Sequence, residues 1–114
     1  MRDQRLYLIH IIECITRIER YTAEGKAAFF ADPKTQDAVL RNLQTLAEST
    51  QRLSPDLRAA RPEVDWRGIA GFRNVLVHDY LGINMVRVWE IVERDLRGLK
   101  GRMEVILNSL ESKS

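Results

Sequence analysis

The chain has 114 residues, of which 45% are hydrophobic and 30% are charged, and its formal net charge is +2. This length and composition predict one folded domain over residues 1–114 and exclude an intrinsically disordered chain. The balanced charge does not indicate nucleic-acid binding by itself, although it is compatible with a local basic cleft.

The first predicted helix covers roughly residues 3–22. Leu6 and Ile9 widen its apolar stripe, so we expect neighbours on more than one side of this helix. The charged residues inside the segment and the lack of a small-residue cleavage site are unlike a signal peptide. With Cys14 as the single cysteine and no apolar run of about 18 residues, we expect a cytoplasmic protein without a disulfide or a membrane span. The stripe itself consists of Leu8, Ile11, Ile12, Ile15 and Ile18.

Residues 23–31 either continue the first helix or form a short second one, and Phe29 and Phe30 are expected to fill the core there. Asp32 followed by Pro33 is typical of a helix start, with a capping carboxylate and a proline at the first helical position. The helix that they begin is predicted to run to about residue 53. Its apolar face carries Val39, Leu43, Leu46 and Leu53.

Ser54 and Pro55 repeat this start signal, and they predict a short helical turn that ends before Pro62. Residues 58–65 are expected to form a linker on the surface. At its end, Asp65 is predicted to cap the next helix, which contains the stretch GFRNVLVHDY.

The last two predicted helices meet at Gly82, which ends the first of them, and at Asn84, which caps the second. The whole chain therefore predicts an all-α fold, an up-and-down four-helix bundle with one or two short extra helices. The final helix has the most regular apolar pattern of the chain, namely Met85, Val88, Trp89, Val92, Leu96, Leu99, Met103, Ile106 and Leu110.

Several kinds of site are excluded or disfavoured by the residues present. Gly68 and Gly71 lie inside a helical pattern and form no phosphate loop. His10 and Cys14 are four residues apart, but one such pair indicates a core-edge histidine and a buried thiol more simply than a metal site. We expect no metal and no cofactor. The last helix alternates acidic and basic residues, which is typical of a solvated, ion-paired face: Glu90, Glu93 and Asp95 with Arg87, Arg94 and Arg97.

The stretch GFRNVLVHDY (71–80) interrupts an apolar helical pattern with polar side chains, among them Arg73, Asn74, His78 and Tyr80. All four have structural explanations: Arg73 in an ion pair, Asn74 and His78 bonded to backbone groups, and Tyr80 as a core aromatic with a wet hydroxyl. The functional alternative is an RNA-cleaving site, because arginine binds phosphate and histidine transfers protons near neutral pH. On one helix Arg73 and His78 would project about 140° and about 7.5 Å apart, which makes direct contact difficult.

The run R-N-V-L-V-H-D-Y resembles the R-x4-H-x-Y motif of the HEPN superfamily, in particular its HepT-like toxin branch. Trp66, the GFRN lead-in, the YLGIN exit and the pair Val88-Trp89 match as well. The resemblance implies a homodimer whose two motifs face a shared cleft. It also implies a metal-independent endoribonuclease with Arg73 and His78 as the catalytic pair and Asn74 as an orienting residue. Attack by the ribose 2′-hydroxyl is the expected chemistry, and transfer RNA is the substrate suggested by analogy.

Tyr80 matches the tyrosine that a partner nucleotidyltransferase antitoxin adenylylates in this branch. The resemblance therefore implies a type VII-like toxin–antitoxin system in which the added phosphate and bulk silence the ribonuclease. One alternative is a non-catalytic HEPN subunit that binds nucleotide or serves as a scaffold for the nucleotidyltransferase. Another is a simple four-helix interaction protein, which would leave the polar residues unexplained.

Overall fold

The computed structural model describes residues 3–77 and 84–112, and only the backbone of residues 74–77. All regular structure in this part of the chain is helical. The segments are α1 (Gln4–Tyr21), α2 (Lys26–Ala31), α3 (Pro33–Arg52), α4 (Pro55–Ala59), α5 (Trp66–Val77), α6 (Met85–Glu90), the π-helical turn η1 (Ile91–Asp95) and α7 (Leu96–Ser112).

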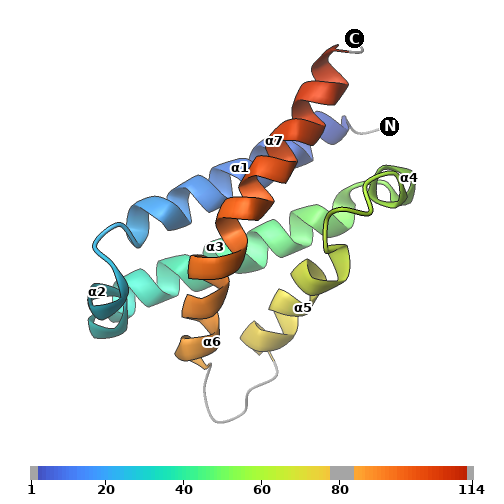
Figure 1. Ribbon diagram of the computed structural model, residues 1–114. Helices are drawn as coiled ribbons and strands as arrows, with labels where there is room; N and C mark the ends of the chain where they lie inside the picture. The colour runs from blue at the N-terminus through green and yellow to red at the C-terminus, as the bar shows by residue number, and fades with distance from the viewer. Residues whose placement is uncertain (1–2, 78–83, 113–114) are drawn as a thin grey trace.

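The predicted all-α bundle is confirmed, with α1, α3, α5 and the continuous α6–η1–α7 helix as its long members and α2 and α4 as the two short ones. Figure 1 shows α1 and α3 side by side, with α7 crossing α1. On the other side α5 packs against α3. The two ends of the described chain lie at the same end of the bundle, whereas the end of α5 and the start of α6 lie at the opposite end.

The predicted helix starts are confirmed by capping side-chain oxygens, which accept hydrogen bonds from backbone N–H groups of the first turn. Asp32 accepts from the Lys34 N–H at 3.0 Å and from the Thr35 hydroxyl at 2.8 Å. The Thr35 hydroxyl and the Lys34 N–H together hold the pKa of the Asp32 carboxyl below its usual value, because both favour the charged form. Ser54 caps α4 and Asn84 caps α6 in the same way.

The core lies where α1, α3 and α7 meet, and the predicted apolar faces of α1 and α3 point into it. Phe29 is 1% exposed and reaches Trp89 across the core, with ring centroids 5.2 Å apart. Cys14 is buried as predicted, and that burial raises the pKa of its thiol. His10 lies at the core edge, where its Nδ1 is 2.9 Å from the Ser49 hydroxyl.

Four single positions differ from their predictions. Leu6 and Ile9 are 64% and 38% exposed, because α1 packs against α3 and α7 but neither of these helices covers the two side chains. Phe30 is exposed, since α2 is a single short helix and can turn only one of its two phenylalanines inward. The segment 58–65 is largely on the surface as predicted, but Val64 is 4% exposed and anchors it to the core.

The long C-terminal helix differs from its prediction at η1. A regular α-helix would place Val92 on the buried face, but Ile91 is 1% exposed and Val92 is only half-buried. The wider π turn explains the change, because it lets Ile91 and Leu96, five residues apart, face the core together. π turns of this kind often occur at functional sites.

Candidate functional site

Two sets of hydrogen bonds fix the start of α5, the helix that carries the beginning of the motif. The Asp65 carboxylate accepts from the Gly68 N–H at 2.9 Å, which confirms the predicted cap. A Cβ at position 68 would collide with that carboxylate, so glycine fits here. The Trp66 indole N–H is shared between the carbonyl oxygens of Arg58 and Arg61, each 3.0 Å away.

The inner face of α5 is held by Ile69 and Phe72, which are 4% and 5% exposed, and the helix packs on α3. Arg73, the next residue along, is exposed. No carboxylate of the described residues lies within 4 Å of its guanidinium. The structural explanation of Arg73 as an ion-pair partner is therefore without support in this part of the chain.

The other predicted site residues are only partly covered. Asn74 belongs to α5, one residue after Arg73, but its side chain is not described. His78 and Tyr80 lie outside the described residues, as does Gly82, the predicted end of the helix. The pairing of Arg73 with His78 and the role of Tyr80 therefore remain predictions.

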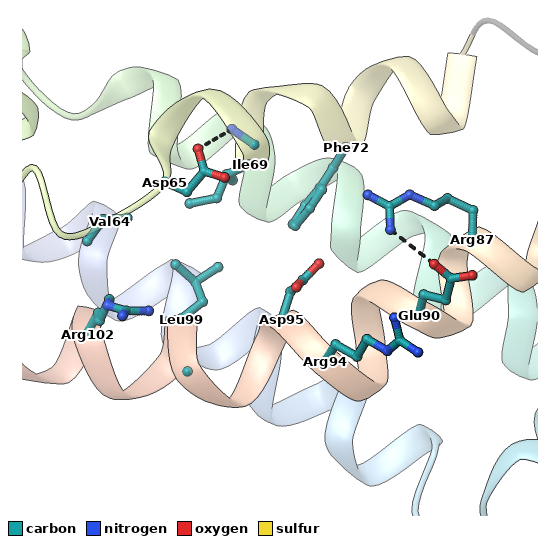
Figure 2. Close-up of a pocket in the computed structure, with 12 residues that line it drawn as sticks. Val64, Asp65, Ile69, Phe72, Arg87, Glu90, Arg94, Asp95, Leu99 and Arg102 are labelled. Atoms are coloured by element: carbon teal, nitrogen blue, oxygen red, sulfur yellow. Dashed lines mark hydrogen bonds and ion pairs between the residues drawn. The ribbon is translucent and has the colours of Figure 1, made fainter.

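A groove of about 440 Å³ runs between α5 and the α6–η1–α7 helix. Figure 2 shows Ile69 and Phe72 projecting into it from α5, and Asp95 and Leu99 projecting from the opposite side. The apolar side chains form its floor. The charged residues that line it are Asp65, Arg87, Glu90, Arg94, Asp95 and Arg102.

These charges do not form the continuous ion-paired face that the alternating pattern predicts. Arg87 does pair with Glu90, with 3.4 Å between nitrogen and oxygen. Glu93 instead accepts the indole N–H of Trp89 at 3.0 Å. Among the described residues, no carboxylate lies within 4 Å of the Arg94 or Arg102 guanidinium.

Comparison with known proteins identifies the family. The model of the family described as Ribonuclease HepT-like matches residues 11–106, most of the chain. The chain belongs to the HepT-like ribonuclease family. This finding confirms the resemblance drawn from the motif, and no solved structure gives a significant match to this HepT-like chain.

Individual relatives agree with the family match. A "Probable ribonuclease HepT" of Thermococcus cleftensis is 36% identical over 104 residues, which are 90% of this chain and 94% of the relative. A "Putative RNase" of Caldanaerobacter subterraneus subsp. tengcongensis is 33% identical over 94% of this chain and 96% of its own. In Methanocaldococcus jannaschii, a "Gamma-glutamylcyclotransferase and putative RNase" is 32% identical over 96% of this chain, which spans half of that longer protein.

Residues 3–77 and 84–112 contain no group of three or more histidine, cysteine, aspartate or glutamate side chains arranged to hold a metal ion. None of their helices combines the length and apolar character that crossing a membrane requires.

The sequence reasoning missed the arginines that line the groove. The alternating charge pattern assigns Arg87 and Arg94 to a solvated ion-paired face, and it gives Arg102 no role. Their spacing of seven and eight residues was the available signal, because it keeps all three near one side of a helix. The spacing places the three arginines on one side of a helix, but it does not say what faces that side. In the structure, α5 lies opposite it across the groove.

Proposed function

We propose that this HepT-like chain is an endoribonuclease that acts as the toxin of a toxin–antitoxin pair in the cytoplasm. The motif R-N-V-L-V-H-D-Y (73–80), in a chain that belongs to a ribonuclease family, carries the proposal. The exposed position of Arg73 on α5, with no carboxylate near it in the described residues, supports it. A guanidinium that the described residues leave without a carboxylate partner is available to bind an RNA phosphate.

The proposed reaction uses the RNA's own 2′-hydroxyl as the nucleophile. Its oxygen forms a bond to the neighbouring phosphorus while the bond from phosphorus to the 5′-oxygen breaks. The products are a 2′,3′-cyclic phosphate and a 5′-hydroxyl. His78 is the general acid/base, Arg73 stabilises the charge that develops on the phosphoryl oxygens, and Asn74 orients these groups.

A homodimer would complete this site. One proton must leave the 2′-hydroxyl and another must reach the 5′-oxygen, and a single histidine cannot do both at the same moment. Two motifs facing one cleft would supply two histidines. Arg73 and His78 of one chain project about 140° apart on their helix. In a dimer, Arg73 of one subunit could act with His78 of the other, so the two side chains of one chain need not meet.

Tyr80 is the proposed control point. A partner nucleotidyltransferase would join the Tyr80 oxygen to the α-phosphate of ATP and release pyrophosphate. The attached AMP would add bulk and negative charge two residues from His78, where the RNA phosphate must bind. Steric exclusion and like-charge repulsion would then silence the enzyme.

The test is to incubate the purified chain with total RNA in the presence of a chelator and to map the new ends. We expect 2′,3′-cyclic phosphate and 5′-hydroxyl ends, and no new ends with His78→Ala. Full activity of His78→Ala, or a strict metal requirement, would overturn the mechanism. Absence of both RNA cleavage and growth arrest would favour the scaffold alternative.

A further inference from the structure

We infer that the groove between α5 and the α6–η1–α7 helix binds the RNA strand next to the scissile phosphate, with Arg94 and Arg102 contacting its backbone. The inference rests on the proposed ribonuclease function, and it adds a substrate-binding surface outside the R-x4-H-x-Y motif. The groove offers about 440 Å³ of space along the motif helix.

Available positive charge is the first argument. Arg94 and Arg102 are exposed at the groove and have no carboxylate within 4 Å among the described residues, whereas Arg87 is paired with Glu90. Eight residues separate Arg94 from Arg102, or about 12 Å along a helix at about 1.5 Å per residue. Two guanidiniums so far apart are suited to two different phosphates of one strand and not to a single small anion.

The groove is also continuous with the proposed catalytic helix. Phe72 lines the groove, and the next residue on α5 is Arg73. Arg87 lies at the other end of the lining from Arg102, close to the start of α6, and this start lies at the same end of the bundle as the end of α5. Arg73 does not itself line the groove, but it follows Phe72 on α5, so a strand that Arg73 binds lies one helix position from it. Ile69 and Leu99 give it an apolar floor against which bases can lie.

The charges that line the groove favour a polyanion once their partners are considered. Three arginines face three carboxylates there, but Arg87 pairs with Glu90, and Asp65 accepts the Gly68 N–H. Arg94 and Arg102 are left against Asp95 alone, with no ion pair to another of the described residues. Two open guanidiniums against one carboxylate favour RNA over a second protein as the occupant of the groove.

Asp95 allows a test in which RNA affinity should rise and not fall. Its carboxylate projects into the groove from the same helix as the two arginines, and it has no arginine or lysine within 4 Å among the described residues. A negative charge there repels a bound phosphate strand. Asp95→Asn should therefore tighten RNA binding, a result that a misfolded variant cannot imitate.

The experiment measures fluorescence anisotropy of a labelled, uncleavable 2′-O-methyl oligonucleotide at several salt concentrations. For Arg94→Gln with Arg102→Gln, we expect affinity to fall by about ten-fold per arginine and the salt slope to drop by about 0.7 per lost contact. Arg97→Gln is the matched control, because Arg97 is exposed on the same helix but does not line the groove. It should stay within about two-fold of wild type, and Asp95→Asn should bind about two- to three-fold tighter.

Several results would overturn the inference. One is a double variant that binds RNA like Arg97→Gln. A second is a double variant whose assembly mass changes while its RNA affinity does not, which would make the groove a protein interface. Unchanged affinity in Asp95→Asn would also count against it. If the double variant binds normally and wild type still cleaves RNA, only the groove inference fails, whereas a wild type that neither binds nor cleaves overturns the proposed function too.

Discussion

The two sides of this bundle are built differently. Where α1 meets α3, the facing side chains are fully buried, as Leu8, Ile15 and Leu43 show with 0% exposure. Where α5 faces α6–η1–α7, the helices leave a groove with an apolar floor and exposed arginines. The closed side, between α1 and α3, therefore stabilises the fold. The open side, between α5 and α6–η1–α7, leaves an accessible surface beside the family motif.

The largest effect on stability should come from the closed side. Ile15→Ala should lower the free energy of unfolding by about 2–5 kcal/mol, because it leaves a cavity in a fully packed core. Leu99→Ala on the groove floor should cost clearly less, since water from the groove can fill the space. Chemical denaturation of both variants measures the difference, and equal losses would show that the two sides are packed alike.

The largest effect on activity should come from the open side. Arg73→Ala should reduce RNA cleavage by about 10²–10³-fold, the usual cost of removing one group that stabilises transition-state charge. Arg67→Ala is the matched control, because Arg67 is an exposed arginine on the same helix but outside the motif. Both variants should keep the wild-type melting temperature. Equal activity of the two in a gel-based cleavage assay would remove Arg73 from the site.

A smaller effect is expected where the two sides join, at the start of α5. Asp65→Ala should lower the free energy of unfolding by about 1 kcal/mol, because the Gly68 N–H loses its capping oxygen. Adding Gly68→Ala to this variant should then be tolerated, although Gly68→Ala alone collides with Asp65. Thermal melts of the two single variants and the double variant would reveal this coupling, and strictly additive losses would contradict it.

The smallest effect should be a gain. Gly101 lies inside α7, and a Cβ there would have no neighbour within 4 Å. Gly101→Ala should therefore raise the free energy of unfolding by up to about 1 kcal/mol through helix propensity alone. A rise of the melting temperature by a few degrees is expected, and a fall would show that a contact at this position had been overlooked.

The sequence predicted the closed side of the molecule well. Helical spacing identified the buried faces of α1 and α3, and the capping residues Asp32, Ser54, Asp65 and Asn84 were all correct. Such signals are local, because a cap and an apolar stripe are each determined within a few turns of one helix. The exposure of Leu6 was missed because no local pattern says how many neighbours a helix has.

The open side was harder to predict. The π turn at η1 shifts burial from Val92 to Ile91, and the apolar spacing of the sequence fits an uninterrupted α-helix equally well. The groove forms between two helices about 20 residues apart in the chain. The position of Arg94 and Arg102 beside it therefore follows from the packing of these helices and could not be predicted from local sequence patterns. The motif itself was found through family resemblance, because spacing alone left Arg73 open to an ordinary ion pair.

The central claim is that this HepT-like chain cleaves RNA through the substrate's own 2′-hydroxyl. Its most direct test uses a short RNA with at least two mapped cleavage sites, in which the 2′-hydroxyl next to one of the cut bonds is replaced by hydrogen. In the presence of a chelator, we expect cleavage at that bond to disappear while other bonds are still cut. Cleavage of the substituted bond at the original rate would contradict the claim, because the nucleophile would then have to be water or a protein group.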